Sequence, residues 1–118
     1  MIYLAPPTVP DAIASEPQLV TRQGLAYVNL AIRFDAPAER DLDLFAALMN
    51  GLAPRKVLVH CQVNFRASSM VFLYRTIYRK EEPRGAFESV SSVWAPDAVW
   101  QRFIIEQLRK HGIDFDPF

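Results

Sequence analysis

Hydrophobic positions along the chain follow two different periods, which predict short buried strands alternating with amphipathic helices. Short apolar runs rich in β-branched and aromatic residues predict strands at residues 2–4, 26–32 and 56–60. Apolar residues three or four positions apart predict helices at 16–24, 38–51, 97–111, and beyond Arg66 as far as the charged cluster at 79–82. The segment 86–93 fits neither period clearly. The last two strands are apolar enough to be covered on both faces.

The alternation of strands and helices predicts an α/β fold with a parallel sheet flanked by helices. Parallel strands are joined by right-handed crossovers, which place functional loops at the carboxyl ends of the strands. With 118 residues, the chain has the length of a single small domain, residues 1–118. Cys61 directly follows the third predicted strand, at such a carboxyl end.

Composition and charge exclude several classes of function. Thirteen basic and thirteen acidic residues cancel, so no overall field favours nucleic acid or an anionic membrane. No apolar run approaches the roughly 20 residues that span a bilayer. One cysteine permits neither an internal disulfide nor a multi-cysteine zinc site. The first residues lack the pattern of a signal peptide, and we expect a cytoplasmic protein without metal or cofactor.

The segment from Cys61 to Arg66 has the residues of an anion site with a nucleophile. A tight turn from strand into helix brings successive backbone N–H groups together, and the first amides of the helix add to them. The same positive field stabilises a cysteine thiolate. A planar guanidinium such as that of Arg66 binds two phosphate oxygens at once. The sequence therefore predicts a phosphate loop between a central strand and a helix.

Displacement at phosphorus also needs a proton donor for the leaving oxygen, usually a carboxylic acid on a neighbouring loop. Asp35 follows the second predicted strand and is the first candidate for this role. Asp41 and Asp43 are weaker candidates, because the period places them within a helix. Asp35 before Ala36-Pro37 is equally typical of a turn or of a helix cap.

The run Val57-Leu58-Val59-His60-Cys61 followed by Arg66 resembles the signature of protein tyrosine and dual-specificity phosphatases. It is most similar to the bacterial phosphatase-like domain of beta-lactamase-hydrolase-like proteins. The resemblance extends over most of the chain, through the first two predicted strands, the helix from Glu16 to Gly24, the turn 34–37, and Trp100 with Phe103.

The resemblance implies hydrolysis of a phosphate monoester, on a small molecule or a phosphoprotein, through a phosphocysteine intermediate and without metal. It assigns Cys61 as nucleophile, Arg66 as phosphate clamp, Asp35 as general acid and His60 as a loop-orienting residue. The other residues expected around the phosphate are Gln62, Val63, Asn64, Phe65, Ala67 and Ser68.

The loop departs from the common pattern of these phosphatases in three ways. It has four residues between Cys61 and Arg66 rather than five, and none is glycine, so Asn64 is expected to take the left-handed conformation. Ala67 stands where a hydroxyl usually helps the sulfur to leave, with Ser68 one position later. The chain also begins at what corresponds to the family's second strand. A homodimer that covers the resulting sheet edge is therefore expected.

Other interpretations remain open at this point. A lone cysteine is most often a buried core residue, but a buried Arg66 beside it is hard to explain in that way. Trp94 and Trp100 are most simply core residues, although an aromatic ring near the loop suits a phenyl group. Two further functions are a catalytically inactive phosphate-binding module with the same loop, and a rhodanese-type sulfurtransferase.

Overall fold

The computed structural model describes all 118 residues. Three short strands and five helices follow one another along the chain, and the predicted α/β class is confirmed. The elements are β1 (Ile2–Tyr3), α1 (Glu16–Arg22), β2 (Val28–Asn29), α2 (Glu39–Leu52), β3 (Val59–His60), α3 (Phe65–Ile77), α4 (Pro83–Ser91) and α5 (Ala98–Lys110). No helix is long and apolar enough to span a membrane.

The three strands form a parallel sheet in the order β2-β1-β3. Ile2 lies opposite Val28 on one side and Val59 on the other, so the first strand of the chain is the middle strand of the sheet. Backbone hydrogen bonds continue the pairing beyond the strand ends, for example from the Leu4 N–H to the His60 carbonyl at 2.8 Å. The prediction of a parallel sheet is confirmed, whereas the central place predicted for the strand before Cys61 is wrong.

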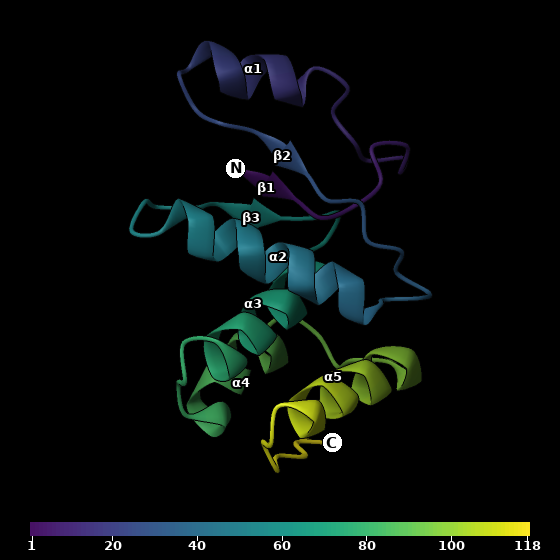
Figure 1. The fold of residues 1–118 in the computed structure, drawn as a ribbon. Coiled ribbons are helices and arrows are strands. Elements are labelled where there is room, and N and C mark those ends of the chain that lie inside the picture. The colour runs from purple at the N-terminus through teal and green to yellow at the C-terminus, as the bar shows by residue number, and fades with distance from the viewer.

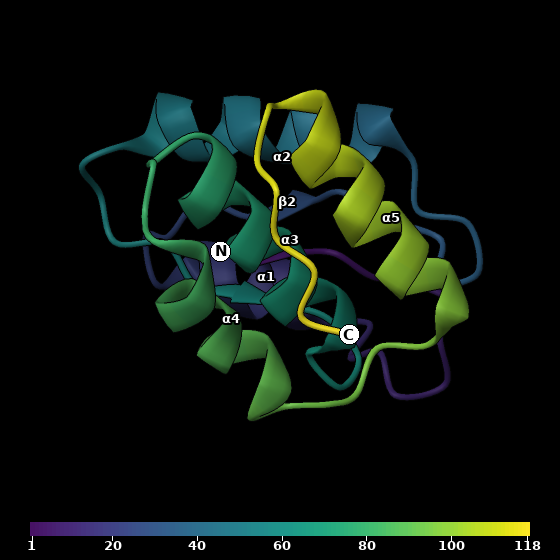
Figure 2. The same cartoon turned by 90° about the horizontal axis from the view of Figure 1, so that it is seen from below.

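The helices lie on both sides of this sheet. In Figure 1 the sheet separates α1, at the top, from the helices below it. Figure 2, seen from below, shows α3 in the middle, with α2, α4 and α5 around it. α3 contacts α2, α4, α5 and β3, and it follows directly on β3 and the Cys61 loop. This enclosed helix therefore holds one end of the loop in place.

The core is centred on α3 and the face of the sheet that it covers. Most of α3 is buried, and the two residues of β1, Ile2 and Tyr3, are 0% and 4% exposed. Aromatic and branched residues from α2 and α5 complete the packing. The largest side chains that are fully buried are Trp100, Phe45, Phe72, Ile2, Leu4, Ile32, Leu42, Met70, Leu73, Ile77, Ile104 and Leu108.

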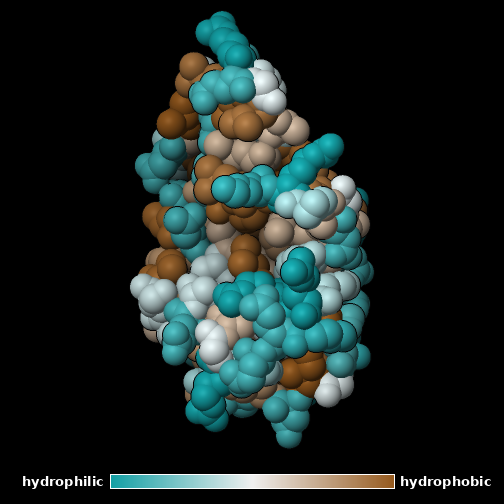
Figure 3. Space-filling model, turned by 90° about the vertical axis from the view of Figure 1, so that its left-hand side faces the viewer, coloured by the Kyte–Doolittle hydropathy of each residue, from teal (hydrophilic) through white to brown (hydrophobic).

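The two outer strands are less covered than their sequences predict. Leu58 beside β3 is 59% exposed, and Asn29 in β2 is also exposed. No residue of β2 or β3 is fully buried, so the expectation of burial on both faces is wrong for both strands. Figure 3 views the end of the molecule where the strands begin, and hydrophobic residues are visible in the upper half of this face. The predicted homodimer remains a prediction.

Residues 83–91, most of which the sequence left ambiguous, form the helix α4. Glu82 caps it, because its carboxylate accepts hydrogen bonds from the backbone N–H groups of Arg84 at 2.9 Å and Gly85 at 2.8 Å. These bonds lower the pKa of Glu82. Ala86 and Val90 are buried against the core. The charged cluster that ends α3 therefore also begins the next helix.

Candidate functional site

A hollow of about 330 Å³ lies where the loop after β3 meets the segments that follow β1 and β2. The carboxyl ends of all three parallel strands therefore contribute to it, as the sequence predicts for functional loops. Its walls are mostly apolar, and Arg66 is the only charged residue among them. The lining residues are Pro6, Val9, Phe34, Cys61, Gln62, Val63, Phe65 and Arg66.

The backbone of the loop turns sharply at Asn64 and then enters α3. Asn64 has φ 66° and ψ 14°, which confirms the predicted left-handed conformation in a loop without glycine. Its side-chain oxygen lies 3.5 Å from the Cys61 nitrogen, at the limit of a hydrogen bond. No backbone N–H from Gln62 to Ala67 donates a hydrogen bond within the chain. The loop and the first turn of α3 thus present consecutive free donors next to the hollow.

Arg66 is buried without a counter-ion. Its residue exposure is 5%, and no carboxylate forms an ion pair with it. One guanidinium nitrogen, Nη1, donates to the Ile32 carbonyl at 3.0 Å, and the charged carbon lies 5.6 Å from the centre of the Phe34 ring. Nε is buried and has no partner. A buried, unneutralised cation is costly unless an anion binds beside it.

An aromatic cluster forms one side of the site. Phe65 stacks on Trp94, with ring centres 4.4 Å apart and planes at 6°, and Phe34 lies 5.7 Å from the same indole. Trp100 is fully buried, and its indole N–H donates to the Phe34 carbonyl at 2.8 Å. The core position predicted for Trp100 is confirmed, and through this bond α5 holds the turn that carries Phe34.

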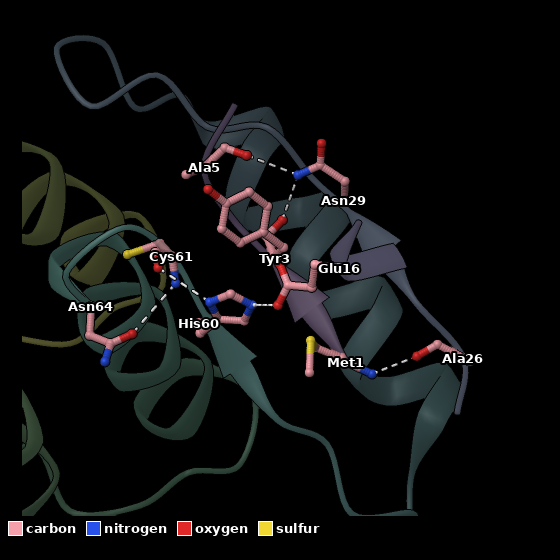
Figure 4. Close-up of polar contacts among 9 residues, drawn as sticks. All are labelled: Met1, Tyr3, Ala5, Glu16, Ala26, Asn29, His60, Cys61 and Asn64. Carbon is pink, nitrogen blue, oxygen red and sulfur yellow. Dashed lines mark hydrogen bonds and ion pairs between the residues drawn. The ribbon is translucent and has the colours of Figure 1, made fainter. Parts of the chain in front are cut away.

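Cys61 is buried, with 6% of its surface exposed, and it lines the hollow. Its carbonyl oxygen lies 3.2 Å from Nδ1 of His60 (Figure 4). The other ring nitrogen, Nε2, lies 2.7 Å from Glu16 Oε1, although its N–H does not point straight at that oxygen. His60 therefore lies behind the loop, between Cys61 and α1, and does not line the hollow.

Asp35, the carboxylate that the sequence indicates as general acid, is next to Phe34 of the hollow, whereas Asp11, which the sequence does not indicate, contacts the loop. Asp35 follows Phe34 but points into solvent, with 71% of its side chain exposed, and binds Arg33 through two bonds of 3.1 and 2.9 Å. The bond to Arg33 lowers the pKa of Asp35. Asp11 contacts the loop itself, because its Oδ2 accepts from Gln62 Nε2 at 3.1 Å.

The structure separates the predicted site residues into two groups. Cys61, Arg66, Gln62, Val63 and Phe65 line the hollow together. Asn64 shapes the turn, whereas Ala67 and Ser68 lie within the first turn of α3. The Ser68 hydroxyl donates to the Phe65 carbonyl at 3.2 Å, so it is engaged within its own helix.

Several residues of the site carry no local signal in the sequence. Pro6, Val9 and Asp11 lie between β1 and α1, and Glu16 is the first residue of α1, a segment that predicts only turns and a helix start. Their closeness to the loop results from the pairing of β1 with β3. No three side chains of histidine, cysteine, aspartate or glutamate come together in a metal-binding arrangement.

Comparison with solved structures identifies the fold. The crystal structure of a "Putative phosphatase (DUF442)" from Shewanella putrefaciens CN-32 at 1.40 Å resolution matches with a TM-score of 0.83 and 30% sequence identity, over 93% of this chain and 72% of that one. The chain belongs to the DUF442 family. A second structure of the same protein, at 1.60 Å resolution, matches with a TM-score of 0.81 and 30% identity, over 92% and 70% of the two chains.

The DUF442 match covers nearly the whole domain, so the chain shares a phosphatase-like fold and not merely a loop with this relative. No family model matches the sequence, and no curated protein is significantly similar to it. Because the identity is modest, the roles of individual residues depend on the geometry described above.

Proposed function

We propose that the chain is a cysteine-dependent phosphatase that hydrolyses phosphate monoesters through a phosphocysteine intermediate. The observation that carries this proposal is the buried Arg66 without a counter-ion, beside consecutive backbone N–H groups that have no acceptor. A phosphate dianion satisfies both, since it accepts several hydrogen bonds and neutralises the guanidinium. The DUF442 relative, which is named "Putative phosphatase", supports the same reaction class.

The proposed reaction has two displacement steps at phosphorus. In the first, the Cys61 thiolate attacks phosphorus, the S–P bond forms, and the bond to the ester oxygen breaks with its electron pair leaving on oxygen. A carboxylic acid protonates that oxygen. In the second, water attacks phosphorus, gives a proton to the same carboxylate, and the S–P bond breaks to return the thiolate and inorganic phosphate. Arg66 and the loop amides stabilise the charge on the phosphoryl oxygens in both steps.

The walls of the hollow favour an aromatic leaving group. Phe34, Phe65, Val9 and Val63 surround the space above the loop, and none of these side chains can hydrogen-bond to a polar leaving group. A phenyl ring buries apolar surface there and stacks on neighbouring rings. The substrates supported best are therefore aryl phosphates, phosphotyrosine among them.

The proposal is tested first by turnover of p-nitrophenyl phosphate by the wild-type chain in the presence of a chelator. We expect release of p-nitrophenol with saturation kinetics and competitive inhibition by vanadate. Sulfur transfer from thiosulfate to cyanide is measured in parallel. Turnover of thiosulfate without hydrolysis of the phosphate ester would point instead to the rhodanese-type alternative.

One observation favours a second function, an inactive phosphate-binding module. Ala67 offers no hydroxyl to help the sulfur leave, and the Ser68 hydroxyl is bound to the Phe65 carbonyl. In such a module, inorganic phosphate binds but p-nitrophenyl phosphate is not hydrolysed. A phosphoenzyme that forms and is not hydrolysed would locate the defect in the second displacement.

Asp35 is proposed as the general acid, and its contact with Arg33 gives a test. A general acid must be protonated, so activity falls as pH rises through its pKa. Arg33 lowers the pKa of Asp35, and Arg33→Gln removes that effect. In the Arg33→Gln variant, the fall of kcat/KM at high pH should therefore move to higher pH. The measurement is a pH profile of wild type and variant with the same substrate.

Asp11 provides the matched comparison, because its carboxylate contacts the loop directly through the Gln62 side chain. Loss of the general acid should slow hydrolysis of phenyl phosphate by about 100-fold but hardly slow an activated ester, whose leaving oxygen needs no proton. We expect this pattern for Asp35→Asn and not for Asp11→Asn. The reverse pattern, with an unchanged pH profile for Arg33→Gln, would assign the role to Asp11.

A further inference from the structure

A second, smaller hollow of about 190 Å³ shares Cys61 and Gln62 with the first. It lies between the loop and α1. His60, Cys61 and Glu16, whose contacts Figure 4 shows, are among the residues that line it. The ring is held on both sides, by Cys61 O at 3.2 Å from Nδ1 and by Glu16 Oε1 at 2.7 Å from Nε2. The Tyr3 ring packs against it, with centroids 4.8 Å apart.

The acceptors around His60 determine where its protons lie. A carbonyl oxygen can only accept a hydrogen bond, so Nδ1 donates its proton to Cys61 O. Nε2 is buried, and the Glu16 carboxylate is the polar group that lies beside it, at 2.7 Å, so this carboxylate holds the other edge of the ring. Glu16 thus keeps the ring oriented with its Nδ1–H toward the loop.

The bond to Cys61 O also fixes the next amide. In a trans peptide the C=O and the following N–H point in opposite directions, so holding the Cys61 carbonyl toward His60 turns the Gln62 N–H away from it. The Gln62 N–H is the first of the consecutive loop donors that have no partner in the chain. The orientation of this donor therefore depends on His60.

We propose that Glu16 is a positioning residue of the phosphate site, which acts through His60 to hold the Cys61–Gln62 peptide with its N–H toward the bound phosphate. This inference rests on the proposed function. Glu16 is distinguished from the other carboxylates in ion pairs, because only 17% of its side chain is exposed, compared with 42% to 71% for Glu81, Glu39 and Asp35.

The test compares three substitutions of Glu16 with one matched control. Glu16→Gln removes the charge but keeps a side chain of the same length that can hydrogen-bond to Nε2. Glu16→Asp keeps the charge on a side chain that is shorter by one methylene, and Glu16→Ala removes both the charge and the hydrogen-bonding group. Glu39→Ala is the control, since Glu39 also begins a helix and pairs with a basic residue, Lys110, at 2.9 Å. The readouts are kcat/KM for p-nitrophenyl phosphate and the inhibition constant of inorganic phosphate.

We expect Glu16→Ala to lower kcat/KM and to weaken phosphate binding by about tenfold each, the effect of one hydrogen bond. Glu16→Gln should stay close to wild type, Glu16→Asp should fall between the two, and Glu39→Ala should be unchanged. If Glu16→Ala does not fold, the proposal is tested by comparing kcat/KM of Glu16→Gln with that of Glu16→Asp. Higher activity in Glu16→Asp than in Glu16→Gln would show that charge, and not positioning, matters, and would overturn the proposal.

The coupling to His60 is measured with His60→Ala and the double variant. If Glu16 acts through His60, the Glu16→Ala substitution has no further effect once the ring is absent. An equal loss in both backgrounds would overturn the inference. Phosphate binding is also measured without turnover, as protection of Cys61, the only cysteine, from iodoacetate. If the wild type is inactive but phosphate protects Cys61 in the expected order of variants, the phosphatase proposal is refuted and the positioning role of Glu16 is not.

Discussion

Cys61→Ser is expected to abolish hydrolysis of p-nitrophenyl phosphate while leaving phosphate bound at the loop. A serine hydroxyl at its ordinary pKa is a poor nucleophile, and the phosphocysteine cannot form. Loss of a nucleophile that acts with its neighbours as a unit lowers kcat by about 10 000-fold or more. The free amides and Arg66 are untouched, so the affinity for inorganic phosphate should stay within about threefold of wild type.

The two readouts of Cys61→Ser separate the candidate functions. Wild-type activity with an inactive variant that still binds phosphate supports the cysteine mechanism. Turnover that survives in Cys61→Ser contradicts it. If wild type and variant are both inactive but bind phosphate with equal affinity, the result supports the inactive phosphate-binding module. Thermal unfolding of both chains controls for folding, because Cys61 lies in the core.

Arg66→Lys is expected to lower kcat by about 100-fold to 1000-fold, the range found when a preorganised donor to a developing oxyanion is lost. Lysine keeps the charge but not the planar fork, so it cannot bind two phosphoryl oxygens while also donating to the Ile32 carbonyl. The substitution thus tests geometry separately from charge. The measurement is kcat and KM with p-nitrophenyl phosphate.

Arg75→Lys is the matched control for this prediction. Arg75 lies on the same helix as Arg66 and binds Glu81 at 2.9 Å, but it lies outside the lining of the hollow. We expect its kcat to remain within a few-fold of wild type. An Arg66→Lys chain that is as active as the control, and as stable in thermal unfolding, would show that Arg66 supports the fold and not the reaction.

The local parts of the site were predictable, because they depend on residues next to one another. An apolar strand followed by Cys61 and a helix that begins near Arg66 required the turn that the structure shows. The absence of glycine left Asn64 as the residue best suited to a positive φ, and its φ is 66°. These features follow from the conformational preferences of single residues.

The parts that depend on distant pairing were not predictable. Nothing in the sequence around Glu16 shows that it reaches His60, because that contact exists only once β1 lies beside β3. The same holds for Asp11 at the loop. The sheet order itself was misjudged, since the apolar strand before Cys61 has the composition of a central strand but lies at an edge.

For Asp35, the sequence predicted the position near the site correctly but did not reveal the contacts of its side chain. Its place after the second strand puts it beside Phe34, which lines the hollow. Its side chain nevertheless turns to Arg33, two positions earlier, and remains in solvent. A sequence places a carboxyl group near a site but does not determine which neighbour its rotamer selects.

The middle place of β1 in the sheet has a consequence for how the domain folds. β1 pairs with two strands that follow it in the chain, β2 and β3, so both of its neighbours are in place only after His60 has left the ribosome. Until then β1 can pair with β2 alone. The sheet and the Cys61 loop therefore assemble together and late, and this domain should fold more slowly than a helical bundle of equal length.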